Sequence, residues 1–207
     1  EAAQSMAGAI TRETEPVTAN AARYGELMGI YREIYPQLRG TFDFGLPVAP
    51  HSSVWSRTAA GVARGDRIDS AANFYFGAFG NNYVDYRNEK RYREFYSFPG
   101  LALNELGGRN FARTMVEWNL PPWRFARVGT PGAYLTWVRP AIFAGVLATN
   151  MDAPDIRHIA GTAGGQADFR FTVLSNLDMT LSVGAGWAFE EHYGPRHEVM
   201  VSLKVLR

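Results

Sequence analysis

The stretch from Phe95 to Pro122 reads FYSFPGLALNELGGRNFARTMVEWNLPP, and its second half decides the fold. Between Asn110 and Leu120, successive side chains of an extended chain fall on opposite faces. One face carries Ala112, Thr114, Val116, Trp118 and Leu120, and the other carries Phe111, Arg113, Met115, Glu117 and Asn119. This period of two predicts a β-strand whose apolar face lies opposite a face with an arginine and a glutamate.

The same period recurs on both sides of this strand. Alternating segments lie at 41–48, 54–62, 73–78, 167–173, 179–189 and 198–205, and a less regular one at 133–149 contains Pro140. We therefore expect about eight strands in an all-β fold, most of them longer than the usual five or six residues. Short turns such as Ser175-Asn176 predict antiparallel neighbours.

The N-terminal part follows a different pattern. Residues 1–16 are small and polar, and apolar residues between Tyr24 and Tyr35 recur at helical spacing as far as Pro36. We expect a tail and a short helix in residues 1–39, with a strand beginning near Tyr31 as the alternative.

The β-region is expected over residues 40–207, with a long loop at 80–106. The chain begins at Glu1 without a methionine or a signal peptide, so we expect a mature or excised form.

Composition restricts the class of protein. Of the 207 residues, 46% are hydrophobic and 20% are charged, which is not typical of a disordered chain. The formal net charge of +1 provides no overall basic field, so we expect no nucleic-acid partner. No run of about 18 apolar residues is present, which argues against a transmembrane helix, whereas barrel strands need only about 9–11 alternating residues.

The polar face of the predicted strands distinguishes two kinds of barrel. In 179–189 that face consists of Thr180, Ser182, Gly184, Gly186 and Ala188, which suits a crowded interior better than a water-exposed surface. In other strands it carries isolated charges: Asp43, Arg57, Arg113, Glu117, Asp168, Arg170, Glu198 and Lys204. We expect these charges to face a lumen and to pair across it, as in a membrane barrel. A soluble barrel with solvated charges is the alternative.

The segment Phe98–Glu117 resembles part of a known family. Its matching pieces are Phe98-Pro99-Gly100-Leu101, Gly107-Gly108-Arg109-Asn110, and a strand ending in Glu117 and then Pro121. They resemble the sixth extracellular loop and following strand of the bacterial surface-antigen barrels, the outer-membrane assembly and two-partner-secretion superfamily. In that family the barrel has sixteen strands, five of which follow this loop. Because five candidate strands follow it here and three precede it, the resemblance covers about residues 40–207, the C-terminal half of such a barrel.

The resemblance implies an antiparallel transmembrane β-barrel in the outer membrane of a diderm bacterium, surrounded by outer-membrane lipid. It implies a part in a pore or in a protein-translocation or assembly barrel. The alternative is a plugged barrel that anchors an envelope complex or binds a partner within it. Eight strands either close a narrow barrel by themselves or form half of a wider one. In the second case a protein partner or a preceding part completes the barrel, because lipid does not satisfy open edges.

Two departures from the family pattern bear on activity. The arginine that anchors the family's loop in the lumen falls here at Pro99, with Arg109 and Arg113 as candidate substitutes. The chain ends in Leu206-Arg207, where such barrels end in an aromatic residue. The first 40 residues are also too short for a periplasmic POTRA-like domain. These departures argue against insertase activity and favour the anchor alternative.

The run YVDYRNEKRYREFY, at the start of the predicted long loop, mixes charges with aromatic residues. It suits a lumen plug or a partner-contacting loop, and equally a solvated loop packed on itself.

No motif of an enzyme is found. His51, Ser52 and Ser53 are adjacent in sequence, but adjacency does not make a triad. His192 and His197 have a spacing unsuited to a metal site. We expect no enzymatic activity, no cofactor and no metal.

Overall fold

The computed structural model describes residues 37–65, 72–80, 90–174, 176–191 and 193–206. The predicted helix before Pro36 and the alternative strand near Tyr31 both lie outside the described residues. No helix in the described part of the chain is long and apolar enough to cross a membrane.

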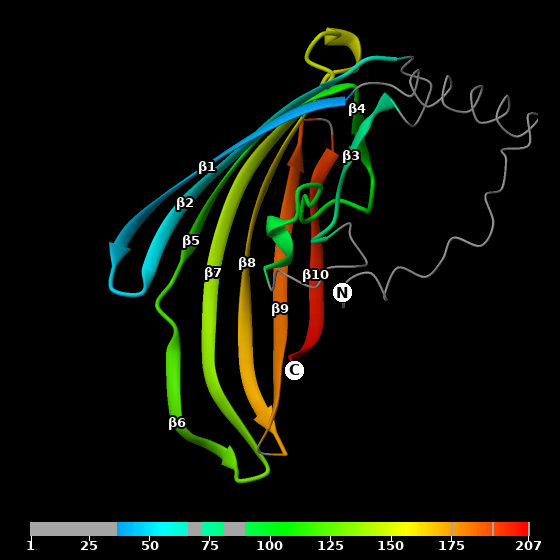
Figure 1. Ribbon diagram of the computed structural model, residues 1–207. Helices are drawn as coiled ribbons and strands as arrows, with labels where there is room; N and C mark the ends of the chain where they lie inside the picture. The colour runs from blue at the N-terminus through cyan, green and yellow to red at the C-terminus, as the bar shows by residue number, and fades with distance from the viewer. Residues whose placement is uncertain (1–36, 66–71, 81–89, 175, 192, 207) are drawn as a thin grey trace, which may run out of the picture. The chain divides into compact units, whose positions relative to one another are not determined.

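One antiparallel sheet makes up most of the described chain, as predicted. Its strands are β1 (Gln37–Ala49), β2 (Ser52–Ala63), β5 (Asn110–Asn119), β6 (Trp123–Thr130), β7 (Ala133–Thr149), β8 (His158–Val173), β9 (Leu177–Glu190) and β10 (Tyr193–Leu206). Their order is β1-β2-β5-β7-β8-β9-β10, and β6 pairs with β7. The sheet is curved and open, with β1 and β10 at its two edges (Figure 1).

β5 and β6 are two halves of one interrupted strand. β5 pairs with Ala141–Thr149 of β7, and β6 pairs with the preceding part of the same strand, Ala133–Val138. Leu120-Pro121-Pro122 separates the halves, and proline has no N–H to donate to a ladder. The eight strands therefore occupy seven positions across the sheet.

In the described chain the main sheet has eight strands, the number predicted, but one predicted strand lies outside it and one of its strands was not predicted. Residues 73–78 were expected to form a strand of the main sheet. They form only β3 (Phe74–Phe76), which pairs with β4 (Leu106–Gly108) in a separate two-stranded sheet. β6 was not predicted as a strand, because the two prolines and the arginines around it obscure its alternation. β8 also begins at His158, well before the predicted residue 167.

The register divides the sheet into two faces. The inner face carries Arg113 and Glu117 of β5, and the outer face carries Val116 and Trp118. The pairing places these apolar residues of other strands on the outer face: Phe42, Phe44, Val62, Ile142, Val146, Phe169, Val183, Trp187, Val201 and Leu203. In β1, β2, β5, β7, β8, β9 and β10, no Asp, Glu, Lys or Arg lies on the outer face.

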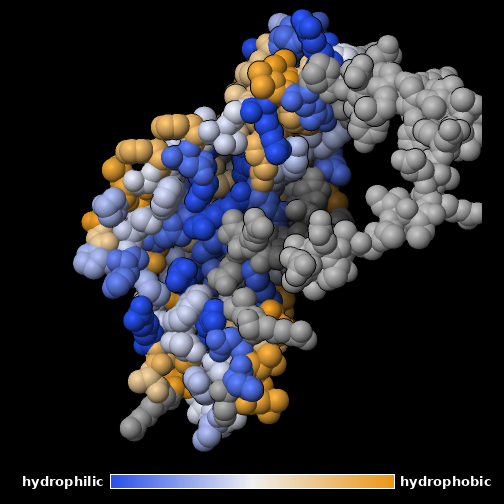
Figure 2. Space-filling model, viewed as in Figure 1, coloured by the Kyte–Doolittle hydropathy of each residue, from blue (hydrophilic) through white to orange (hydrophobic). Residues whose placement is uncertain are grey.

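The inner face is covered by a segment that we call the inner loop, residues 72–80 and 90–105. It contains β3 and the 3₁₀ turn η2 (Arg91–Arg93), whereas a second turn, η3 (Pro154–Ile156), lies between β7 and β8. Figure 2 shows hydrophilic side chains gathered over the middle of this face and hydrophobic ones along its margins.

The inner loop and the sheet share a buried aromatic core. Phe74 and Phe76 pack on Phe111 of β5, with ring centroids 4.8 and 4.9 Å away. Tyr92 stacks on Phe143 of β7 at 4.3 Å. All five side chains are at most 4% exposed, so the loop is part of the folded core.

Candidate functional site

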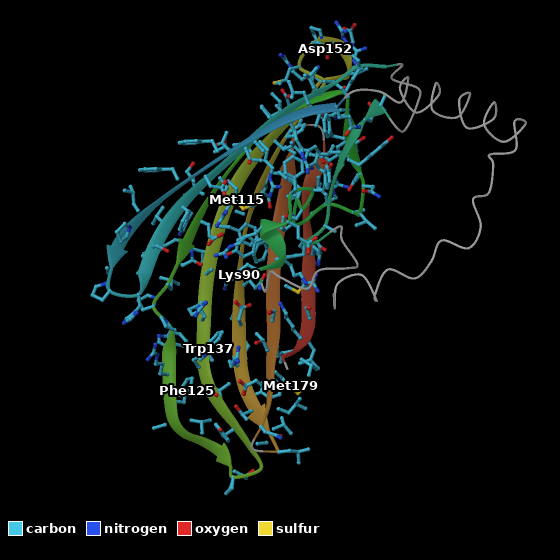
Figure 3. All side chains as sticks on the ribbon, viewed as in Figure 1. Lys90, Met115, Phe125, Trp137, Asp152 and Met179 are labelled. Carbon is cyan, nitrogen blue, oxygen red and sulfur yellow. The ribbon has the colours of Figure 1, made fainter. Side chains whose placement is uncertain are left out.

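A buried ion pair connects the inner loop to the middle of the sheet (Figure 3). Lys90 Nζ lies 2.8 Å from Asp168 Oδ2 of β8, and the two side chains are 4% and 1% exposed. Lys90 Nζ also donates to the carbonyl of Arg139. Asp168 Oδ1 accepts hydrogen bonds from Gln166 Nε2 at 2.6 Å and from Ser182 Oγ at 2.8 Å. A buried pair needs such additional bonds, because each charge has lost its hydration.

Burial and the contact with Asp168 act on the pKa of Lys90 in opposite directions. Burial lowers the pKa of the ammonium group below its ordinary value, and the attraction and hydrogen bond of Asp168 only partly oppose the effect. The charge of Lys90 therefore depends on its partner on β8.

A second carboxylate, Glu117 on β5, binds the loop through Arg93. Arg93 Nε donates to Glu117 Oε2 at 2.7 Å, and Arg93 Nη2 donates to Glu117 Oε1, which makes the contact bidentate. Arg57 Nε of β2 lies 3.5 Å from the same carboxylate, and Arg57 Nη1 donates to Asp43 Oδ2 of β1 at 2.6 Å. A chain of alternating charges thus runs from edge strand β1 to the loop.

Arg113 holds the loop by its backbone. Its side chain is buried, and Nη1 donates to the carbonyls of Phe95 at 2.6 Å and of Glu94 at 3.2 Å. Nη2 contacts the carbonyl of Tyr92 at 3.4 Å. Of the two candidate substitutes for the family arginine, Arg113 therefore contacts the loop from the sheet. Arg109 instead pairs with Asp152 in the β7–β8 connection, at 2.8 Å.

The turn Phe98-Pro99-Gly100 lies against β8, β9 and β10. Thr162 Oγ1 donates to the Pro99 carbonyl at 2.7 Å. Glu198 of β10 accepts hydrogen bonds from the N–H groups of Phe79 and Gly100, both at 3.0 Å. Gly100 has φ +98°, and a Cβ there would lie 2.3 Å from the backbone N of Ala188.

The small residues of β9 make room for the loop. A Cβ on Gly184 would lie 2.9 Å from the Phe79 ring, and a Cβ on Gly186 would lie 2.6 Å from Pro99 Cβ. The inner face of β9 therefore has small residues where the loop packs against it.

The second half of the loop motif lies elsewhere. Gly107 and Gly108 belong to β4, which pairs with β3. A Cβ on Gly108 would lie 2.7 Å from Thr149 Cβ at the end of β7. The two parts of the motif thus contact different strands, β8–β10 for Pro99-Gly100 and β7 for Gly108.

The structure places all eight predicted charges on the inner face. They are Asp43, Arg57, Arg113, Glu117, Asp168, Arg170, Glu198 and Lys204. Asp43, Arg57 and Glu117 belong to one chain of charges, Arg113 and Asp168 bind the loop, and Arg170 pairs with Asp178 on β9 at 2.7 Å. Their partners lie on neighbouring strands and on the loop, and within the described residues no ion pair bridges an open lumen.

Sequence reasoning missed two residues that hold the loop, Lys90 and Arg93. Lys90 and Arg93 stand in a run of mixed charges in which no local pattern separates buried from solvated residues. Glu198 alternates correctly with Val199, which identifies its face but not its backbone partners.

Within the described residues, the adjacent His51, Ser52 and Ser53 form no catalytic triad. Ser52 Oγ donates to the carbonyl of Asn119 at 3.0 Å and accepts from Trp118 Nε1 at 3.0 Å, so its hydroxyl is engaged in structure. His192 lies outside the described residues. Among those described, no group of His, Asp and Glu side chains is arranged to hold a metal.

The chain was compared with protein-family models, curated proteins and solved structures, and none of them matches it.

Proposed function

We propose that this chain supplies part of an outer-membrane β-barrel of the pore or protein-translocation and assembly type, with the inner loop closing the lumen. The single observation that carries the proposal is the outer face, on which no Asp, Glu, Lys or Arg lies in the described strands β1, β2, β5, β7, β8, β9 and β10. Large apolar side chains there are about half exposed, among them Phe44 at 51%, Ile142 at 48% and Trp187 at 48%.

Water does not favour such a face. Soluble monomers rarely expose contiguous apolar patches larger than a few hundred Å². A bilayer favours it, because strands of a membrane barrel present apolar residues to lipid and polar or small residues inward. The resemblance of Phe98–Glu117 to the surface-antigen barrels supports the same assignment and remains a prediction.

The two open edges set a condition on the rest of the barrel. Each of the seven positions is antiparallel to the next, so β1 and β10 run in the same direction. Pairing them with each other, or with a second copy inserted in the same orientation, would make a parallel pair. An all-antiparallel barrel therefore needs an odd number of further strands between β10 and β1, supplied by a protein partner or by a preceding segment.

A plugged barrel that anchors a partner is the second candidate function. It is favoured by the burial of the loop's side chains, since Phe98 and Tyr92 are fully buried between loop and sheet. Electrical conductance across a planar bilayer separates the candidates. A gated pore conducts once the loop is released from the sheet, whereas a plugged anchor shows no conductance or unfolds.

Substituting Ile142 by arginine tests the membrane assignment. Ile142 lies on the outer face of β7, and an arginine at the middle of a lipid-facing strand costs about 2–4 kcal/mol. We expect the variant to lose that much free energy of unfolding in phosphatidylcholine vesicles, measured by denaturant titration. Met151→Arg is the matched control, because Met151 is 45% exposed in the turn beyond β7. Equal stability of the two variants would mean that water, not lipid, faces Ile142.

The native mass in detergent tests how the sheet is completed. We expect the folded species to exceed the 23.0 kDa of this chain and to release a second polypeptide, or to be a longer parent polypeptide. A monodisperse, folded 23.0 kDa species with protected β1 and β10 amides would show that the edges need no further strands.

A further inference from the structure

A pocket of about 350 Å³ lies on the inner face beside the turn between β1 and β2. Its lining includes four arginines from four segments: Arg57 of β2, Arg93 of the inner loop, Arg124 of β6 and Arg139 of β7. Among the described residues, no aspartate or glutamate lines it. The interruption at Pro121-Pro122 opens this side of the sheet, and β6 resumes with Arg124 on the inner face, opposite Trp137.

Two of these arginines are neutralised and two are not. Arg57 and Arg93 share the carboxylates of Asp43 and Glu117. Arg124 and Arg139 have no carboxylate partner within the described residues. Arg139 lies over the ring of Trp137, 4.7 Å from its centroid. Trp137 is labelled in the lower half of the sheet in Figure 3. Within the described part of the chain, the pocket therefore holds two arginines that pair with no carboxylate beside two that do.

We propose that this pocket binds an anion carrying phosphate groups. Guanidinium groups present planar forks of N–H donors that match phosphate oxygens, and they remain charged at every physiological pH. The volume falls within the range of small-ligand pockets. Asn119 also lines the pocket, but its amide is already engaged: Oδ1 accepts from Arg93 and Nδ2 donates to Glu117. The phosphate belongs either to a soluble anion or to a lipid headgroup, and the test distinguishes these sources.

The pocket contains its own reporters. Arg57 lies 5.3 Å from the ring centroid of Trp55, and Arg139 lies 4.7 Å from that of Trp137. An anion that draws these guanidinium groups away changes the environment of both indoles, so tryptophan emission follows binding directly.

The experiment uses the full chain in nonionic detergent, with any copurifying polypeptide left in place. One arm titrates inorganic pyrophosphate at 0.15 M salt, and the other titrates micelles doped with phosphatidic acid against micelles of detergent alone. The variant Arg124→Ala with Arg139→Ala removes the uncompensated charges and leaves no buried carboxylate unpaired. Arg64→Ala with Arg157→Ala removes the same net charge from two exposed arginines outside the pocket.

We expect saturable binding in at least one arm, weakened about tenfold or more by the pocket variant and less than about twofold by the control. Binding in the pyrophosphate arm identifies a soluble anion, and binding in the phosphatidic acid arm alone identifies a lipid phosphate. The proposal is overturned if neither ligand binds the unmodified chain, or if both double variants weaken binding equally. Neither result bears on the lipid exposure of the outer face.

Discussion

Replacing Asp168 by alanine is expected to lower the free energy of unfolding by about 3–5 kcal/mol, because it leaves the buried Lys90 ammonium without a carboxylate partner. Its partner Lys90 is only 4% exposed, and the hydrogen bonds from Gln166 and Ser182 would lose their acceptor as well. Denaturant titration of tryptophan fluorescence in detergent measures the change.

The control for Asp168→Ala is Asp152→Ala, which removes a half-exposed partner of Arg109. We expect it to cost under about 1 kcal/mol. A second variant, Lys90→Met with Asp168→Leu, removes both charges and should recover most of the stability. A loss under 1 kcal/mol for Asp168→Ala would show that the ion pair does not hold the loop.

The same variant reports on function. Trypsin cleaves after Lys90, Arg91 and Arg93, which lie in or beside the η2 turn, so loop release appears as faster cleavage there. A rise in bilayer conductance together with faster cleavage supports a gated pore. Faster cleavage without conductance supports the plugged anchor.

Gly100→Ala is expected to cost about 2–4 kcal/mol, from left-handed strain and from overlap with the sheet. The new Cβ would lie 2.3 Å from the Ala188 backbone N and 2.7 Å from the Trp187 carbonyl carbon. Neither backbone atom can move aside as a flexible side chain would.

Hydrogen exchange localises the effect of Gly100→Ala. The N–H groups of residues 79 and 100 donate to Glu198, and we expect their protection to fall. Gly40→Ala is the control, because a Cβ there meets nothing within 4 Å, and a change within about 0.5 kcal/mol is expected. Unchanged protection in Gly100→Ala would mean that the turn does not rest on β9.

The sequence predicted the strands that have one apolar face and one small or polar face. β9 is the clearest case: Met179 to Phe189 alternate without a break, and β9 has these bounds almost to the residue. The segment 73–78 has the same local pattern, but Ala72 and Phe79 on either side of it are buried in the core that the inner loop shares with the sheet, and only Phe74–Phe76 form a strand. Local alternation does not record which sheet a strand joins.

The candidate site was predictable in part, for the same reason. A period of two places Arg113 and Glu117 on one face whatever lies above them. Their burial depends on loop residues about 20 positions away, Arg93 and Phe95, which meet them only after the loop folds back. A mixed run of charges gives no local reason to prefer Lys90 over its neighbours as the buried one.

The odd number of strand positions also has a consequence for sidedness. The chain enters β1 at one end of the sheet and leaves β10 at the opposite end, because the two edge strands are parallel in direction. In the proposed barrel, an odd number of completing strands that precede β1 on the same polypeptide would begin at the end of the sheet where β10 finishes. A domain preceding the first strand would then share a compartment with the C-terminus.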